Sequence, residues 1–210
     1  CGYHAGDEAT MEKVIEIYKK NGVSIGAHPS FNDPENFGRK RMNLSSFGIT
    51  NLIIDQYNIL QSVAEKMSQK VTHIKPHGAL NNMACEDPEL ALVIASAIYS
   101  IDKDLIFLVP TGSEMEKAAK KLDMKIACEI FADRNYEDDG NLVSRSNPNA
   151  LITNPEEAKK HVLNMVQNQA LNCLSGKKIP CQIDSVCIHG DNESSLSTAK
   201  SIRDNLIQNN

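Results

Sequence analysis

The sequence lacks the short motifs that mark the commonest nucleotide-binding sites. It contains no G-x-x-x-x-G-K-[ST] phosphate loop and no G-x-G-x-x-G dinucleotide fingerprint. An ordinary phosphate loop and an ordinary dinucleotide site are therefore excluded. The chemistry that remains is hydrolysis or addition of water, assisted by histidine, aspartate and lysine, with or without a metal ion.

Basic clusters, paired cysteines and long apolar runs are also missing. The net charge is -5, and the densest basic patch, residues 39–41, is too short for a nucleic-acid footprint. The six cysteines form no C-x-x-C pair, so we expect reduced thiols and a cytoplasmic protein. The longest apolar stretch, residues 90–101, is shorter than the ~20 residues that cross a bilayer. We expect a small-molecule substrate, no nucleic acid and no membrane.

Apolar strand-like runs alternate with amphipathic helical segments along the chain, which predicts an α/β fold with parallel strands. With 210 residues, of which 41% are hydrophobic, we expect one domain over residues 1–210. Polar groups end strands along the whole chain, which favours a (β/α) barrel, distorted or incomplete, over an open sheet. The predicted strands are 23–27, 71–75, 105–109, 125–131 and 183–188. The predicted helices are 8–21, 50–68, 88–100, 114–122, 154–172 and 193–208. The loops 30–48 and 132–150 are long enough to be lids or binding loops.

Four of the six histidines follow strand-like runs, beside glycine or proline and just before a helix-starting signal. They are His4, His28, His77 and His189. Parallel strands collect their ligands at their carboxyl ends, so these imidazoles are expected to meet in one pocket and to be catalytic. Histidine titrates near neutral pH and also binds metals, so the set could hold a divalent ion, although its spacing matches no fixed signature. We expect the other two histidines, His73 and His161, to have a structural and not a catalytic role.

Charged residues stand close to these histidines in the sequence. Lys75 and His77 alternate around Pro76, so an extended chain directs both side chains to one face, where the lysine would polarise a carbonyl or bind a phosphate. Asp7 and Asp191 follow a site histidine and precede a helix. Each is either a general base or partner of a histidine, or simply an N-cap.

A second charged group ends the predicted strand 125–131. Glu129, Asp133 and Arg134 form either an acid–base cluster or a structural salt bridge. Arg134 in one long loop and Arg39 in the other are also suited to clamp a carboxylate or phosphate through paired hydrogen bonds.

Six short motifs, in the same order along the chain, resemble the LamB/YcsF family of 5-oxoprolinase A subunits. They lie at residues 1–7, 26–30, 37–39, 75–80, 129–136 and 188–191. The resemblance implies a (β/α) barrel of the glycoside hydrolase/deacetylase type. It also implies ATP-dependent opening of 5-oxo-L-proline to L-glutamate, with ATP as co-substrate and with separate subunits B and C.

The resemblance also suggests roles for the candidate residues. The four histidines, with Asp7 and Asp191, would position water and take its proton. Lys75, with Arg134 or Arg39, would hold the substrate carboxylate or the phosphate. Glu129 and Asp133 are the other substrate-binding candidates. Because no nucleotide motif is visible, we expect the chain to bind or hydrolyse the activated lactam while its partners share the ATP step.

The sequence departs from the family pattern in three places. The D-x-N-x-D-x-G-E motif of an N-terminal strand has no match, and the chain opens in mid-motif at Cys1, so we expect a strand to precede it. Asn81 stands where the family has tyrosine, and the segment after Asp191 is unusually polar. The alternatives are a metal-dependent carbohydrate deacetylase-like hydrolase, or an inactive remnant or scaffold subunit without its N-terminal carboxylates.

Overall fold

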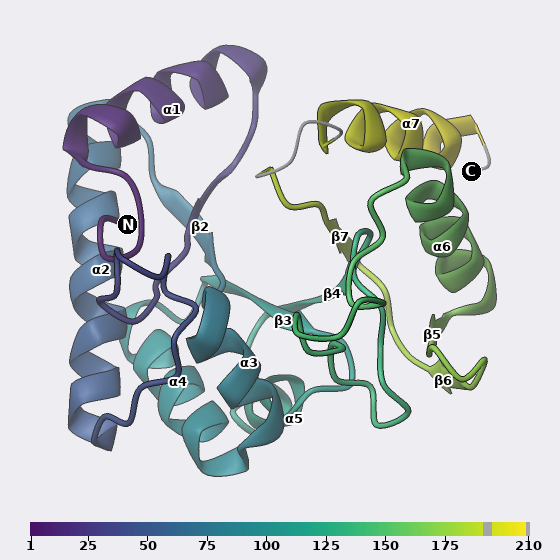
Figure 1. Cartoon of the computed structure of the whole chain (residues 1–210). Helices are drawn as coiled ribbons and strands as arrows, with labels where there is room; N and C mark the ends of the chain where they lie inside the picture. Colours follow the sequence, from purple (N-terminus) through teal and green to yellow (C-terminus); the bar gives the residue numbers. More distant parts are fainter. Residues whose placement is uncertain (191–194, 209–210) are drawn as a thin grey trace. The chain divides into compact units, whose positions relative to one another are not determined.

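A computed structural model describes residues 1–190 and 195–208 (Figure 1). The chain forms two compact units. Unit 1 comprises residues 1–109 and 113–126, and unit 2 comprises residues 110–112 and the chain from 127 onward. Both units combine helices with parallel strands, which confirms the predicted α/β class. The expectation of one domain over the whole chain stays a prediction.

The strands of unit 1 are short and parallel. β1 (Ile25–Ala27) pairs with β2 (Val71–Ile74), and β2 pairs with β3 (Ile106–Pro110), whose last residue belongs to unit 2. The predicted strands at 23–27, 71–75 and 105–109 are confirmed to within two residues at each end. A glycine is needed in β1, because a Cβ on Gly26 would lie 2.1 Å from Nε2 of His73 in β2.

Five helices belong to unit 1: α1 (Glu8–Asn21), α2 (Ser46–Lys66), α3 (Gly78–Glu86), α4 (Pro88–Ile101) and α5 (Glu114–Lys121). α4 packs against both α2 and α5, as Figure 1 shows. Asp87 caps α4 by accepting hydrogen bonds from the amides of Glu89 and Leu90, with Pro88 in the first turn.

One helix start and one whole helix in unit 1 differ from the prediction. α2 begins at Ser46 instead of residue 50, because the Ser45 hydroxyl accepts a hydrogen bond from the amide of Gly48 and so caps the helix earlier. α3 was not predicted. It has only nine residues, too few for a clear helical period, and its N-cap residue His77 forms no side-chain capping bond.

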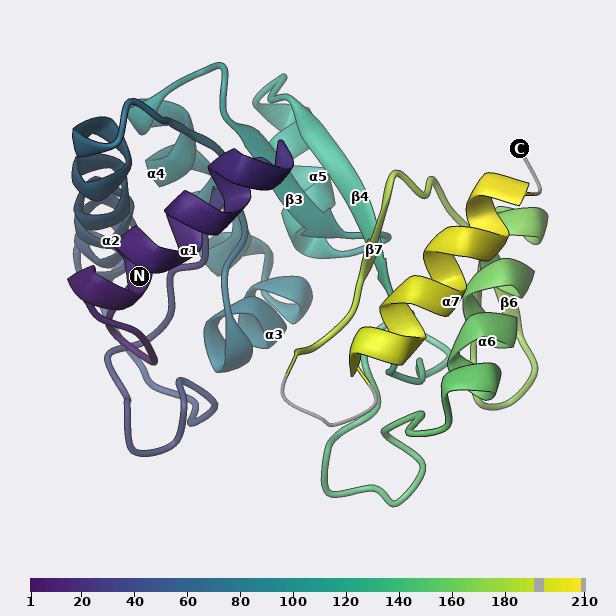
Figure 2. The ribbon, with the colours of Figure 1, turned by 90° about the horizontal axis from the view of Figure 1, so that it is seen from above.

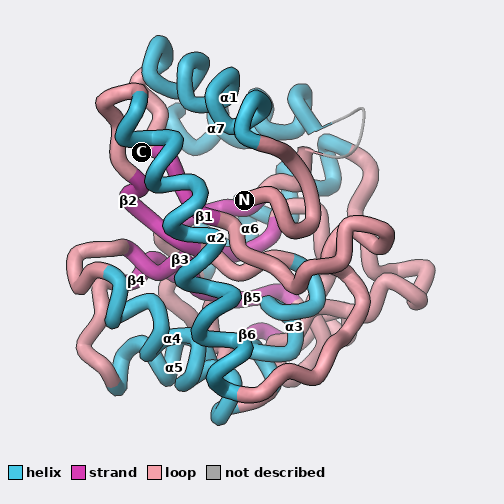
Figure 3. Tube along the Cα trace, turned by 90° about the vertical axis from the view of Figure 1, so that its left-hand side faces the viewer, coloured by secondary structure: helices cyan, strands magenta, loops and turns pink. Residues whose placement is uncertain are grey.

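Large side chains fill the interior of unit 1. Those with less than 2% exposure come from its helices, its strands and two loops: Ile15, Phe31, Ile53, Ile74, Leu80, Ile94, Ile98, Leu105, Phe107 and Met115. They include residues of every helix of the unit, so the removal of apolar surface from water stabilises the whole layer of helices. Figure 3 shows the long loop that joins β1 to α2, in pink.

Unit 2 contains β4 (Ile126–Phe131) paired in parallel with β7 (Ser185–Cys187). The first residue of β4 belongs to unit 1. The helices α6 (Pro155–Asn168) and α7 (Ser195–Gln208) lie side by side (Figure 2). Of the helix predicted over residues 193–208, the part from residue 195 is confirmed, and residues 193 and 194 lie outside the described residues.

The predicted helix over 154–172 is wrong at its C-terminal end. α6 stops at Asn168, and Gln169 adopts a left-handed conformation with φ 48°. The chain then forms an antiparallel hairpin of β5 (Ala170–Asn172) and β6 (Lys178–Pro180). Leu171 of this hairpin is fully buried beside residues of α6, so tertiary packing prevailed over helical periodicity.

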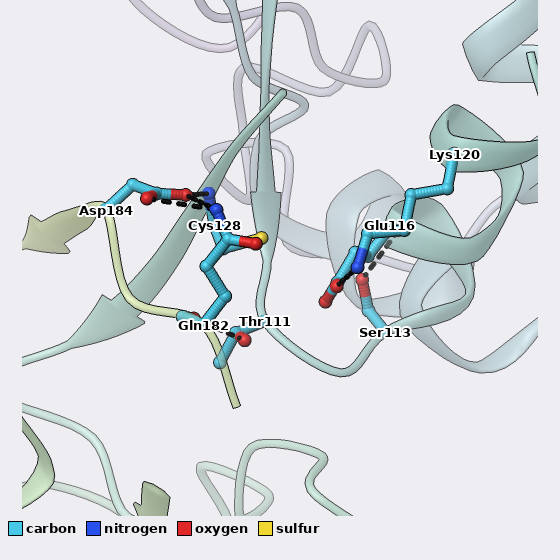
Figure 4. A network of polar contacts seen from close by, with 7 residues as sticks. All are labelled: Thr111, Ser113, Glu116, Lys120, Cys128, Gln182 and Asp184. Atoms are coloured by element: carbon cyan, nitrogen blue, oxygen red, sulfur yellow. Dashed lines mark hydrogen bonds and ion pairs between the residues drawn. The ribbon is translucent and has the colours of Figure 1, made fainter. Parts of the chain in front are cut away.

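Short polar contacts fix the ends of several elements, and Figure 4 shows two such groups. In unit 2, the Asp184 carboxylate accepts a hydrogen bond from the amide of Cys128 at 2.8 Å, and Thr111 donates to the carbonyl of Gln182 at 2.8 Å. In unit 1, Ser113 caps α5. No helix within residues 1–190 and 195–208 is both long and apolar enough to cross a membrane.

Candidate functional site

Three of the four predicted histidines meet in unit 1. His4 lies in the loop before α1, His28 directly follows β1, and His77 lies between β2 and α3. The rings of His4 and His77 stack, with centroids 3.9 Å apart and planes 9° apart. The ring of His28 lies edge-on, 5.8 Å from His4 and 4.8 Å from His77. The predicted convergence of these three imidazoles is confirmed.

A loop with two left-handed residues covers this histidine cluster. Phe37 has φ 56° and Gly38 has φ 65°, and the Phe37 ring lies edge-on to both His4 and His77 at 5.2 Å. The carbonyl of Gly38 accepts a hydrogen bond from the amide of Ala79 at 2.9 Å. A Cβ on Gly78 would lie 2.5 Å from that carbonyl oxygen, so the contact requires glycine at residue 78.

Hydrogen bonds orient the rings of His28 and His77. Nδ1 of His28 lies 2.7 Å from the carbonyl oxygen of Lys75, and Nε2 of His77 lies 2.9 Å from that of Phe37. Because a carbonyl oxygen only accepts, both nitrogens carry hydrogen. Nδ1 of His77 lies 3.1 Å from Nε2 of His28, so one of these two nitrogens donates a hydrogen bond to the other.

The environment disfavours the charged forms of His28 and His4. Burial, reinforced by the charges of Lys75 and His77, holds the pKa of His28 well below its usual value. Burial, with the nearby charges of His77 and Arg39, lowers the pKa of His4 to about 3. The cluster therefore contains two imidazoles whose pKa values lie below the usual range, next to His77, which donates from Nε2.

Two cations border the cluster. Lys75 is half-buried directly after β2, and its charge acts on His28. The Arg39 guanidinium carbon lies 5.1 Å from the centre of the Phe37 ring, and its charge acts on His4. Positive side chains at both places make this part of unit 1 suited to an anionic ligand.

The Asp7 carboxylate is exposed and caps α1. It accepts hydrogen bonds from the amide and the hydroxyl of Thr10, at 2.8 and 2.6 Å. These contacts match the capping alternative, and a catalytic role for Asp7 stays a prediction. Asp191 lies outside the described residues.

The remaining candidates lie in unit 2. Nδ1 of His189 is 2.9 Å from both carboxylate oxygens of Asp133, a buried residue just after β4. The Asp133 carboxylate thereby orients the His189 ring, which stacks on Phe131 with centroids 5.8 Å apart. Glu129 is buried within β4. That His189 joins the other three histidines stays a prediction.

Arg134 supports the loop 132–150. Its buried guanidinium donates to the carbonyl oxygens of Val143 at 2.6 Å and Ala150 at 3.3 Å. The loop is thus organised around this side chain, and the predicted contact of Arg134 with substrate remains untested.

The three imidazoles of unit 1, as they are arranged, do not fit a metal ion. Apart from Nε2 of His4, their nitrogens bond to Ser30, to the carbonyls of Lys75 and Phe37, and to each other. In the part of the chain that the structure describes, no group of three or more His, Cys, Asp or Glu side chains is placed to hold one. The arrangement supports proton transfer and hydrogen bonding by the imidazoles themselves.

Two buried polar residues beside the cluster were not predicted. Ser30 bonds to His4 at 2.8 Å, and Gln56 of α2 bonds to the backbone of Ser30. Gln56 could have been found from the sequence, since it is a polar residue next to the apolar stripe of the predicted helix 50–68.

Residues 22–26 match the pattern G-x-S-x-G, which marks a nucleophilic serine in some hydrolases. Here Ser24 is exposed and precedes β1, whereas the serine of such an elbow follows a strand.

The fold and the cluster define an α/β protein with an imidazole-based site close to the ends of parallel strands. The sequence model of the LamB/YcsF family matches residues 1–210, and the chain belongs to that family. It is 45% identical over 207 residues to the 5-oxoprolinase A subunit of Rhodopseudomonas palustris, covering 98% of this chain and 82% of the relative. It is 44% identical over 206 residues to the protein of the same name from Campylobacter jejuni subsp. doylei, covering 98% and 81%.

A solved structure is also similar. The crystal structure of the lactam utilization protein from Thermus thermophilus matches with a TM-score of 0.90 and 34% identity, covering 99% of this chain and 83% of that one.

Proposed function

We propose that this chain is the A component of a 5-oxoprolinase, which opens the lactam ring of 5-oxo-L-proline to give L-glutamate with hydrolysis of ATP. The relatives are named as a lactam utilization protein and as 5-oxoprolinase A subunits, and these names support the lactam substrate. The observation that carries the proposal is the cluster of His4, His28 and His77, bordered by the cations Lys75 and Arg39.

The proposed chemistry follows from the charges of the substrate. The lactam amide is a poor electrophile, and transfer of a phosphoryl group from ATP to its oxygen would make the carbon easier to attack. The substrate carboxylate and the transferred phosphoryl group are both anionic, which matches the positive charges of Lys75 and Arg39. Water then forms a bond to the carbon, the ring C–N bond breaks, and the nitrogen takes a proton, which leaves an acyl phosphate. A second water splits this acyl phosphate into L-glutamate and inorganic phosphate.

In this proposal, two imidazoles have distinct tasks. A neutral imidazole takes the proton from the attacking water, and His77 donates a hydrogen bond from Nε2 to the carbonyl oxygen of Phe37, which fixes the orientation of its ring. Subunits B and C share the ATP step, because no ordinary phosphate loop is present here. We assign the His189–Asp133 pair a supporting proton-transfer role, and we propose that the strands belong to a (β/α) barrel of the glycoside hydrolase/deacetylase type.

The test measures release of glutamate and phosphate from 5-oxoproline and ATP, by this chain alone and with subunits B and C. We expect turnover only with the partners, and turnover by this chain alone would contradict the division of labour. The complete complex forming no glutamate would contradict the proposed function and favour the scaffold alternative.

A pair of lysine variants locates the site. Lys75→Met is expected to raise the KM for 5-oxoproline about tenfold or more, since it removes a cation beside the cluster. Lys70→Met changes an exposed lysine of the same unit and is expected to leave KM unchanged. Equal KM values for the two variants would place the substrate elsewhere.

A further inference from the structure

Ser30 has a single possible hydrogen-bonding pattern. Its side chain is fully buried, and its hydroxyl donates to the carbonyl oxygen of Phe31 at 2.8 Å. A serine hydroxyl has one hydrogen, and this bond uses it. The second contact, 2.8 Å from Nδ1 of His4, must therefore have Ser30 as acceptor and His4 as donor.

This pattern decides the tautomer of His4. A neutral imidazole carries one hydrogen, and in His4 it lies on Nδ1. The lone pair is then on Nε2. Among the residues that the structure describes, none donates a hydrogen bond to Nε2 of His4. Nε2 therefore carries the lone pair through which a neutral His4 accepts a hydrogen bond or a proton.

Gln56 holds Ser30 in place. Its fully buried amide accepts a hydrogen bond from the Ser30 amide at 3.0 Å and donates to the Ser30 carbonyl at 2.8 Å and to the Leu52 carbonyl at 3.0 Å. Every hydrogen and the oxygen of the amide are thus engaged. Burying such a polar group costs free energy unless it is fully bonded, so the network is stable only in this geometry.

The contacts of His4 restrict its ring further. It stacks on His77 at 3.9 Å and meets the Phe37 ring edge-on at 5.2 Å. A ring held between two others and bonded through Nδ1 is not free to turn over and exchange its two nitrogens. Ser30 therefore controls which nitrogen of His4 faces away from the network.

We propose that Ser30, held by Gln56, is a positioning residue that keeps His4 in its Nδ1–H tautomer, so that Nε2 takes the proton from the water that attacks the lactam. This inference rests on the proposed function. As the water oxygen bonds to the lactam carbon, one water proton moves to Nε2, and His4 becomes an imidazolium that still donates from Nδ1 to Ser30. When the ring C–N bond breaks, the leaving nitrogen takes a proton and His4 returns to the neutral form.

The tautomer is read directly by nitrogen-15 NMR of the histidine-labelled chain. We expect the wild-type protein to show hydrogen on Nδ1 of His4 and a bare Nε2. Ser30→Ala removes the acceptor, and its His4 signal is expected to shift to the Nε2–H form. Ser30→Thr keeps a hydroxyl and should restore the wild-type pattern. A wild-type His4 with hydrogen on Nε2 would overturn the inference.

Kinetics of the complex with subunits B and C provide the second readout. Ser30→Ala is expected to lower kcat for glutamate formation by about 10²-fold, the size of a lost proton transfer, with the KM for 5-oxoproline changed less than about threefold. Ser100→Ala is the control: this exposed serine of α4 donates its hydroxyl hydrogen to the Ala97 carbonyl oxygen at 2.7 Å, and its variant should keep both constants.

The two readouts separate this inference from the proposed function. A wild-type kcat for Ser30→Ala would overturn the positioning role. A complex without any 5-oxoprolinase activity would contradict the proposed function, and the NMR spectra would then still decide whether Ser30 sets the tautomer. If Ser30→Ala does not fold, Gln56→Glu, which retains the acceptor oxygen, is tested in the same two ways and is expected to lower kcat.

Discussion

At the scale of single residues, two histidines of the site have lowered pKa values, so their protonation is disfavoured in the folded chain. The lowered pKa values of His4, about 3, and His28 both arise mainly from burial. An unfolded chain would bind protons at these histidines near pH 6.5, whereas the folded chain resists them. Their contribution to stability is therefore fully present above pH 6.5 and is lost as the pH falls.

Thermal unfolding tests this. Between pH 7 and pH 5 we expect the Tm to fall by roughly 2–4 °C or more, the shift that a loss of about 1 kcal/mol produces in a chain of this size. This pH range lies above the ordinary pKa values of aspartate and glutamate, so the fall in Tm is due to the protonation of histidines. His4→Gln should show a smaller fall, and an equal Tm at both pH values in the wild type would contradict the argument.

Gly78 provides a second residue-scale prediction. Gly78→Ala is expected to destabilise the protein by at least about 1 kcal/mol and to lower activity, because φ is 60° and the new Cβ would push the Gly38 carbonyl away from α3. The matched control is Gly22→Ala, which has a similar φ of 64° but no atom within 4 Å of the added Cβ. Urea unfolding of both variants measures the difference. Equal losses would show that backbone strain alone, and not the close approach, is responsible.

At the scale of elements, the caps of the helices follow from local chemistry. Asp87→Ala is expected to cost about 0.5–2 kcal/mol, since it removes the acceptor for the first amides of α4, while Asp87→Asn should cost only a few tenths. Urea unfolding monitored by circular dichroism provides both values. A full loss for the asparagine variant would mean that charge, and not capping, stabilises this end of the helix.

The elements also show where sequence reasoning stops. α1 and α4 were predicted because aspartate caps and apolar spacing act over a few residues. α3 is short, and its N-cap residue, His77, makes no side-chain hydrogen bond to the first turn. The amide of Ala79, in that first turn, instead donates to the carbonyl of Gly38, 41 residues earlier in the chain. The hairpin of β5 and β6 follows Gln169, which adopts a left-handed conformation. Residues other than glycine seldom adopt this conformation, so the sequence did not predict the end of the helix there.

At the scale of the whole molecule, the remaining prediction is that His189 works together with the histidines of unit 1. If it does, the kcat of the double variant His77→Ala/His189→Ala should be about as low as that of the worse single variant, because residues that act as a unit lose their effect together. Steady-state kinetics of the two single variants and the double variant in the complex measures this. Losses that multiply would indicate that the two histidines act independently.

The sequence by itself determined the α/β class and most helix starts, and it predicted that four histidines meet, of which the structure brings together His4, His28 and His77. Those features depend on periodicity, caps and strand ends, which act over short distances along the chain. Only the tertiary structure decided which nitrogen of His4 carries hydrogen, that Ser30 and Gln56 belong to the cluster, and that Arg134 supports a loop. These outcomes depend on hydrogen-bond acceptors and on burial supplied by residues far away in the chain, and a local sequence pattern does not predict such contacts.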